Sequence, residues 1–174
     1  MPVRRLNHAV LFVRDVERSV TFYREVLGFA PIDGMDGLRG AAFLRAPAST
    51  NDHDLGLFEI GAQAGPSGAG QSTVGLYHLA WEVETLADLV DVSQRLQERN
   101  ALVGATDHAT TKALYARDPD GLELEVSWLV PADLLTPEIL AERDKLKPLD
   151  LPAEVERFGA DTVGGLGISV PALA

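Results

Sequence analysis

The sequence predicts an α+β fold built from two copies of one module, in which a strand and a helix precede three further strands. A repeat is the first observation: at an offset of 70 positions, LNHAVLFVRDV falls on LYHLAWEVETL, and His8 aligns with His78. Each matching segment is rich in apolar, β-branched and aromatic residues, and apolar residues at helical spacing follow it. Because one such module leaves a face of its sheet uncovered, we expect both copies to fold as one domain.

The first module begins with a strand over Leu6–Val13, in which His8 has an apolar setting. Asp15 is the expected N-cap of a helix that ends at Gly28, a residue suited to a left-handed C-cap. Apolar residues recur through this helix at Val16, Val20, Tyr23 and Leu27. Three strands are predicted after it, near Ala30–Asp33, Gly40–Arg45 and Asp54–Ile60.

The second module repeats this order. Thr85 is the expected N-cap of its helix, with Asp88 three residues later, and the helix ends near Asn100. Its apolar residues recur at Leu86, Leu89, Val92 and Leu96. The three strands that follow are predicted at Ala101–Ala105, Lys112–Ala116 and Leu122–Trp128.

These elements predict one domain over residues 1–130, with modules at 3–62 and 74–130. The linker between them, residues 63–73, lies in the Gly- and Ser-rich stretch GAQAGPSGAGQS, which has the composition of a flexible connector. Residues 131–174 form a proline-divided C-terminal extension with one clear helix, about Pro137 to Lys145. We expect this extension to be packed on the domain or to form a subunit contact.

The composition restricts the classes of function. A formal net charge of −11, without a basic stripe interleaved with aromatics, argues against a nucleic-acid partner. No apolar run approaches the roughly 18–20 residues that span a bilayer, and no long apolar segment follows the basic start. We therefore expect a soluble cytoplasmic protein with no membrane partner. Because the chain has no cysteine, a metal site has to use His, Asp, Glu or water.

Histidines at equivalent positions of a repeat point to a metal site. A buried imidazole needs a hydrogen-bond partner or a metal, and for one such residue a hydrogen-bonded core histidine is the simpler explanation. If the two modules pack about a pseudo-twofold axis, however, His8 and His78 converge on that axis. With Glu125 they make two imidazoles and one carboxylate, the facial triad of non-haem iron(II) oxygenases. By the repeat we match Glu59 to Glu125.

Three segments carry a family resemblance: LNHAVLFVRDVERSVTFYREVLGF, GLYHLAWEV and LYARDPDGLELEV resemble the hallmarks of the vicinal oxygen chelate superfamily over roughly residues 3–130. The resemblance implies an open, curved, mixed eight-stranded sheet around a central metal cavity. It also implies a metal ligand on the first strand of each module and a carboxylate four residues after Gly121, which is Glu125. The family more often has Asn where Leu122 stands.

Two further segments resemble the one-domain catechol 2,3-dioxygenase-like members, which are type I extradiol dioxygenases. NDHDLGLFEI implies that His53 is the catalytic histidine outside the metal ligands, and ALYARDPDG implies that Tyr115 is the catalytic tyrosine. TDHATTKALY implies a further active-site histidine, His108. Each has a plainer explanation: a solvated loop residue for His53, a core aromatic for Tyr115, and a backbone hydrogen bond near Asp107 for His108.

The resemblance therefore implies an Fe(II)-dependent extradiol dioxygenase, with Mn, Zn or Ni as alternative ions. The substrates would be a small aromatic diol and O2, and the protein would form a homodimer. Two alternatives remain open. With Glu59 as a fourth ligand beside His8, His78 and Glu125, the chain would resemble glyoxalase I with Zn or Ni. Without a metal it would resemble a bleomycin-resistance type of binding protein. Methylmalonyl-CoA epimerisation lacks a basic cluster for the coenzyme A phosphates.

Overall fold

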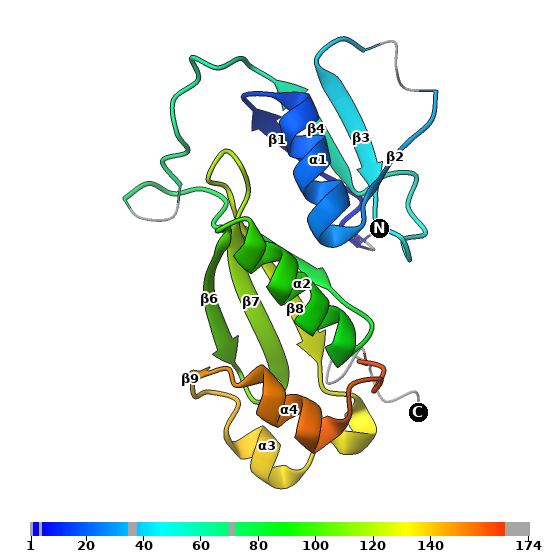
Figure 1. Cartoon of the computed structure of the whole chain (residues 1–174), viewed down its shortest axis with the longest axis vertical. Coiled ribbons are helices and arrows are strands. Elements are labelled where there is room, and N and C mark those ends of the chain that lie inside the picture. The colour runs from blue at the N-terminus through cyan, green and yellow to red at the C-terminus, as the bar shows by residue number, and fades with distance from the viewer. Residues whose placement is uncertain (1, 4, 35–37, 70–71, 166–174) are drawn as a thin grey trace. The chain divides into compact units, whose positions relative to one another are not determined.

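The computed structural model describes residues 2–3, 5–34, 38–69 and 72–165, and the chain divides into two compact units (Figure 1). Unit 1 contains residues 1–68 and 118–122, and unit 2 contains residues 69–117 and 123–174. Parts of the predicted modules, linker and extension lie outside the described residues, namely residues 1, 4, 35–37, 70–71 and 166–174. Each unit has its own sheet and its own long helix.

Unit 1 contains the first predicted module. Its elements are β1 (Ala9–Val13), α1 (Val16–Leu27), β2 (Ala30–Pro31), β3 (Ala41–Arg45) and β4 (Leu55–Glu59). The sheet order is β1-β4-β3-β2, with β1 and β4 parallel and the other neighbours antiparallel. The prediction of a strand starting at Leu6 was wrong: β1 begins at Ala9, so His8 precedes the strand and is exposed.

Unit 2 repeats this order and adds the C-terminal extension. The module consists of β5 (His78–Glu82), α2 (Leu86–Glu98), β6 (Leu102–Asp107), β7 (Thr111–Arg117) and β8 (Glu123–Leu129). The extension adds a 3-10 turn (Ala132–Leu134), α3 (Pro137–Ala141), β9 (Lys147–Pro148) and α4 (Leu151–Phe158). The sheet order is β5-β8-β7-β6-β9, again with a parallel pair, β5 and β8.

The α+β class and the two βαβββ modules are confirmed. The strands form two open mixed sheets of four and five strands, whereas one sheet of eight was expected. The additional strand is β9, in which Lys147 and Pro148 pair with Asp107 and Thr106. A two-residue strand that ends in proline has no periodicity for a sequence pattern to detect. The central metal cavity stays a prediction.

The helix boundaries follow from capping residues that the sequence already indicated. The Asp15 side chain accepts a hydrogen bond from the Arg18 backbone N–H, and Gly28 ends α1 with φ 74°, a left-handed value that glycine adopts without strain. Thr85 and Asp88 form a reciprocal capping box at the start of α2. These caps fix where each chain segment turns from strand to helix.

In each unit the helix covers one face of the sheet. Helix α1 packs on β3 and β4, and α2 packs on β6, β7 and β8 (Figure 1). Strand side chains that point toward the helix are buried, as are Leu55 and Leu57 in β4 and Leu124 and Val126 in β8. We call the opposite face of each sheet its open face; because side chains alternate, Glu125 lies on the open face of unit 2.

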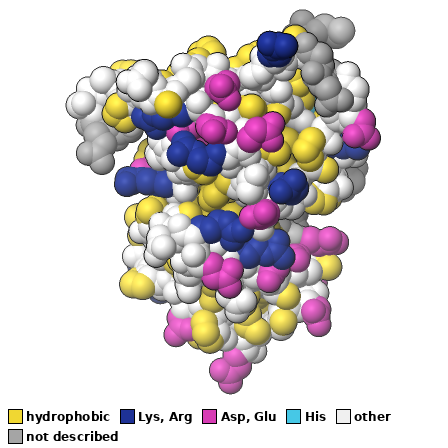
Figure 2. Space-filling view, turned by 45° about the horizontal axis from the view of Figure 1, so that its top comes forward, with side chains coloured by type: hydrophobic (Ala, Val, Ile, Leu, Met, Phe, Trp, Pro, Cys, Tyr) yellow, Lys and Arg dark blue, Asp and Glu magenta, His cyan; other side chains and the backbone are white. Residues whose placement is uncertain are grey.

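Basic side chains lie next to acidic ones on the face drawn in Figure 2. The ion pairs of the described residues include Arg117–Glu123 at 2.9 Å and Lys147–Glu142 at 2.8 Å, which place carboxylates directly on cationic groups.

Among the described residues, no helix has both the length and the apolar character required to cross a membrane.

Candidate functional site

Unit 2 brings a predicted imidazole and the predicted carboxylate together. His78 is the first residue of β5, and Glu125 lies on the adjacent strand β8, opposite Ala80 in the register. The His78 Nε2 and Glu125 Oε2 atoms are 3.1 Å apart. The other oxygen of Glu125 accepts a hydrogen bond from the Ser127 hydroxyl at 2.7 Å. The pairing of parallel strands therefore sets these two groups side by side on the open face.

The second nitrogen of His78 is also informative. Nδ1 is buried and has no hydrogen-bond partner among the described residues. A buried polar atom without a partner is costly, and a water molecule would satisfy it. An ion held together with Glu125 would instead bind Nε2, the nitrogen that faces that carboxylate. The donor set at this position, one imidazole and one carboxylate, suits Fe(II), Mn(II) or Zn(II).

Tyr115 and His108 lie next to this pair. Tyr115 pairs with Glu125 in the β7–β8 register, and its ring centroid is 5.9 Å from that of His78. The Tyr115 hydroxyl lies 2.9 Å from His108 Nε2, so His108 bonds a site residue through its ring rather than only through its backbone. Burial raises the pKa of the Tyr115 phenol, and the negative charge of Glu125 raises it further. The phenol is therefore a hydrogen-bond donor at neutral pH.

Unit 1 brings the other two histidines together. The rings of His8 and His53 have centroids 4.5 Å apart, and the His53 ring also packs edge-on against Phe43 at 5.1 Å. His53 Nδ1 lies 2.9 Å from Asp52 Oδ2, an orienting carboxylate that the sequence analysis missed although it directly precedes the histidine. The pairing Phe43–Gly56 corresponds to Tyr115–Glu125 of unit 2, so this cluster lies on the open face of its own sheet.

Convergence of the whole predicted set stays a prediction. His8 belongs to unit 1, whereas His78 and Glu125 belong to unit 2. Among the described residues, no group of three His, Asp or Glu side chains is close enough to form a ready-made metal site. The structure thus shows two separate clusters, each within one unit: His8 with His53 in unit 1, and His78, Glu125, Tyr115 and His108 in unit 2.

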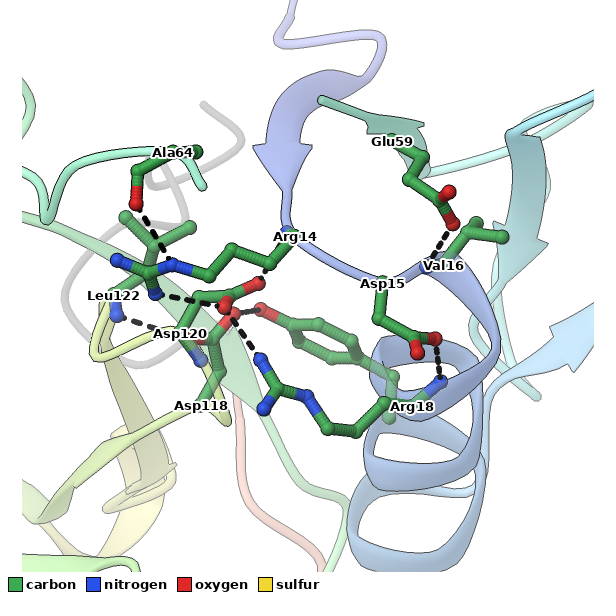
Figure 3. Close-up of polar contacts among 10 residues, drawn as sticks. Arg14, Asp15, Val16, Arg18, Glu59, Ala64, Asp118, Asp120 and Leu122 are labelled. Carbon is green, nitrogen blue, oxygen red and sulfur yellow. Dashed lines mark hydrogen bonds and ion pairs between the residues drawn. The ribbon is translucent and has the colours of Figure 1, made fainter. Parts of the chain in front are cut away.

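The match of Glu59 to Glu125 was wrong. In unit 1, Val10 pairs with Gly56, and the equivalent pair in unit 2 is Ala80 with Glu125. Gly56 therefore stands where Glu125 stands in the other copy. Glu59 lies three positions further along, and because side chains alternate it points to the helix face. There its Oε2 accepts the backbone N–H of Val16 at 3.1 Å, at the start of α1 (Figure 3).

We predict that Glu59→Gln leaves metal content unchanged, because this side chain acts on the α1 N-terminus. The amide keeps an acceptor for Val16 but loses the favourable interaction of a negative charge with the helix dipole, about 0.3–1 kcal/mol of unfolding free energy. Elemental analysis after metal loading and urea unfolding measure the two quantities. A loss of bound metal with an unchanged fold would instead restore the four-ligand alternative.

The turn Asp118–Leu122 belongs to unit 1, where it contacts α1 and the residues before it (Figure 3). Asp120 accepts hydrogen bonds from the Arg14 backbone N–H and guanidinium at 2.9 and 3.0 Å, and it pairs with Arg18 at 2.5 Å. Nothing in the sequence indicated these pairs, because their partners are more than 100 positions apart.

The same turn is closed by the backbone of residue 122 and by Asp118, which explains why Leu122 is accepted where the family more often has Asn. The Leu122 N–H donates to Asp118 Oδ1 at 2.9 Å, and the Asp118 N–H donates to the Leu122 carbonyl at 2.9 Å. Gly121 supplies φ 85° between them. The contacts use no side-chain atom of Leu122.

Tyr23 links this turn to the core, since its hydroxyl donates to Asp118 Oδ2 at 3.2 Å. Burial raises the pKa of Tyr23 well above its usual range, and the Asp118 and Asp120 charges add to this. A raised folded-state pKa means that the unfolded chain ionises first, so the unfolding free energy falls as pH rises above about 10.

We predict that Tyr23→Phe lowers the unfolding free energy by about 1–3 kcal/mol at neutral pH, because a buried hydrogen bond to a carboxylate is lost. The variant should also lose less stability than the wild type between pH 9 and about pH 11. Urea unfolding at both pH values measures this difference. Tyr115 titrates in both proteins, so it does not contribute to the comparison. Equal pH slopes would show that Tyr23 ionises normally.

The chain matches the model of the Glyoxalase/Bleomycin resistance protein/Dioxygenase superfamily over residues 5–126. It belongs to this superfamily. Within it, the chain is 32% identical over 124 residues to a catechol-2,3-dioxygenase of Bacillus subtilis (strain 168), covering 70% of this chain and 40% of the relative. It is 30% identical over 128 residues to biphenyl-2,3-diol 1,2-dioxygenase 3 of Rhodococcus globerulus, covering 70% and 62%. The chain thus spans less than two thirds of either relative.

A solved superfamily structure has a similar fold. The glyoxylase/bleomycin resistance protein/dioxygenase domain from Frankia sp. EAN1pec aligns with a TM-score of 0.59 and 25% identity, covering 72% of this chain and 92% of that one. The superfamily match ends at residue 126, before the extension that contributes β9 and α4 to unit 2. The extension therefore lies outside the part of the chain that defines the superfamily.

Proposed function

We propose that this chain is a metal-dependent extradiol dioxygenase, which uses O2 to open the ring of a small aromatic vicinal diol. The observation that supports this best is the open-face cluster of His78, Glu125, Tyr115 and His108. The similarity to a catechol-2,3-dioxygenase and a biphenyl-2,3-diol 1,2-dioxygenase favours the same chemistry.

The proposed metal ligands are His8, His78 and Glu125. Two imidazoles and one carboxylate are the donor set of non-haem Fe(II) oxygenases, and they leave coordination positions for other groups. Gly56 at the position equivalent to Glu125 supports three protein ligands rather than four. When bound, the ion would supply Lewis acidity and electron transfer between the diol and O2. We propose Fe(II), with Mn, Zn or Ni as alternatives.

The remaining residues would bind the diol and move protons. The Tyr115 hydroxyl, kept protonated by its raised pKa, would donate a hydrogen bond to a substrate oxygen, while His108 Nε2 fixes the direction of that hydroxyl. Asp52 holds His53 by Nδ1, which leaves Nε2 of His53 to give or take a proton. Phe43 would form an apolar wall beside His53.

The test is a substrate panel with iron-loaded protein. Purified chain is reconstituted anaerobically with Fe(II), mixed with catechol, substituted catechols and a biphenyl diol, and exposed to O2. A yellow ring-fission product and O2 consumption in equal amounts are expected, and the Zn-loaded protein serves as control. Colourless reactions across the panel at full iron occupancy would refute the proposal. Sedimentation of the same preparation tests the homodimer that we propose as the working form.

A further inference from the structure

Unit 2 contains a fully buried cation, Lys112 of β7. Its side chain has no exposed surface, and its Nζ lies 2.5 Å from Asp107 Oδ1 and 3.1 Å from Glu154 Oε2. The Phe158 ring centroid is 5.7 Å from the same nitrogen. Asp107 ends β6, whereas Glu154 and Phe158 belong to α4 of the C-terminal extension.

Because Lys112 is fully buried, its ammonium group depends on the carboxylates that surround it. An ammonium group removed from water needs close carboxylates and hydrogen bonds, because its desolvation is costly. Asp107, at the end of β6, provides a carboxylate and a hydrogen bond, and Glu154 of α4 provides a second carboxylate. Lys112 therefore links α4 to Asp107 at the end of β6. The position of Asp107 depends on the ammonium group of Lys112, which also pairs with Glu154 of α4.

Asp107 also fixes the turn that follows it. The oxygen bound by Lys112, Oδ1, accepts the backbone N–H of Ala109 at 2.7 Å. Ala109 has φ 61°, a left-handed conformation that is unfavourable for alanine and needs support from its surroundings. This single carboxylate oxygen thus holds both the buried cation and the strained residue of the turn.

His108 lies between these two residues and projects to the other side. Lys112 pairs with Asp107 in the register, and both lie on the helix face with Leu114 and Ala116. The next side chain, His108, instead reaches Tyr115 on the open face, with 2.9 Å between Nε2 and the hydroxyl. The contacts of Asp107 on the helix face of the sheet therefore determine the position of the His108 ring on the open face.

We infer that α4 acts on the candidate site: Glu154 and Lys112 hold Asp107, and Asp107 positions His108 against Tyr115. The catalytic meaning of this inference rests on the proposed function, but the structural linkage does not. Asp107, Lys112 and Glu154 are positioning residues, because none of them touches the proposed substrate or metal ligands. The extension is thus part of the site's support, although it lies outside the superfamily match.

The first test is Asp107→Asn, which keeps an oxygen for the Ala109 N–H and removes the charge that binds Lys112. The readout is the 15N NMR signature of the His108 ring in the metal-free protein, which is easily assigned because the chain has four histidines. The His108 Nε2 resonance is expected to move toward that of a free imidazole, while those of His8 and His53 stay. A folded variant with the wild-type His108 resonance would overturn the inference.

The second test keeps the hairpin sequence intact. Glu154→Gln removes one of the two carboxylates on Lys112, and Glu156→Gln removes the same charge from an exposed position of the same helix. The His108 resonance should shift in the first variant and not in the second. Identical His108 resonances in both variants would overturn the role of α4, even if Asp107→Asn fails to fold.

Activity separates this inference from the proposed function. In an iron-loaded protein that opens catechol rings, Asp107→Asn should lower kcat about tenfold with little change in KM. A loss of this size is usual when a residue that orients a site residue is removed. If the His108 resonance shifts as expected but no diol is cleaved by any variant or by the wild type, the proposed function fails and the positioning linkage stands.

Discussion

Glu125→Ala should reduce metal uptake by at least about 100-fold, because it removes the only carboxylate among the proposed ligands. Its Oε2 lies 3.1 Å from His78 Nε2, so one substitution deletes half of the ligand pair in unit 2. The fold should persist, since Glu125 points to the open face whereas its neighbours Leu124 and Val126 fill the core. Titration with Co(II) and elemental analysis after Fe(II) loading measure uptake, and ring-fission activity should disappear with it.

Glu123→Ala is the matched control. Glu123 lies two positions earlier on the same face of β8, but its carboxylate pairs with Arg117 at 2.9 Å rather than with His78. Its removal should leave metal uptake within about twofold of the wild type, as expected for an exposed ion pair of little energetic weight. Equal metal content in both variants and the wild type would show that Glu125 is not a ligand, and it would favour a binding protein that lacks the metal triad.

The order of the elements in both modules and the ends of the two long helices could be predicted because local residues determine them, whereas β9 and α4 of the extension were not predicted. Asp15 and Thr85 cap their helices through their own side chains, and Gly28 adopts the left-handed conformation expected of a C-cap. The 70-residue repeat extended these local signals to the fold class. His8 was misplaced because the run LNHAVLFV begins at Leu6, three residues before pairing with β4 begins at Ala9.

Register could not be predicted in the same way. Glu59 and Glu125 are each preceded by an apolar residue and followed by a β-branched one, and an error of three positions leaves that match plausible while moving the side chain to the other face. Only the pairing of β1 with β4 shows that Gly56 is the equivalent residue. The grouping of His78 with Glu125 was implied by the family resemblance, and in the structure both lie near the start of parallel neighbouring strands.

The buried ion pairs could not be predicted from the sequence either. A lysine in a strand usually points to solvent, and the pattern around Lys112 gave no sign that α4 would cover it. The carboxylate that completes its surroundings comes from residue 154, far along the chain. Similarly, Asp120 meets Arg14 across 106 positions. Such pairs depend on how distant elements pack, and a single sequence contains no local signal for them.

Lys112→Met should lower the free energy of unfolding by about 3–5 kcal/mol, the cost expected when one partner of a buried ion pair is removed. Methionine fills a similar volume beside Phe158, so lost packing contributes little. The cost arises because Asp107 and Glu154, with side chains 18% and 13% exposed, would face each other without a cation. Urea unfolding near neutral pH measures the change.

The triple variant Lys112→Met, Asp107→Asn, Glu154→Gln distinguishes charge from packing. It removes the cation and both carboxylates together, so most of the lost stability should return, because buried ion pairs replaced as a set are often close to neutral in stability. Lys145→Met, which breaks an exposed pair with Glu142, should leave stability unchanged. If the triple variant is as unstable as Lys112→Met alone, the unpaired carboxylates do not cause the loss, and the charge explanation is refuted.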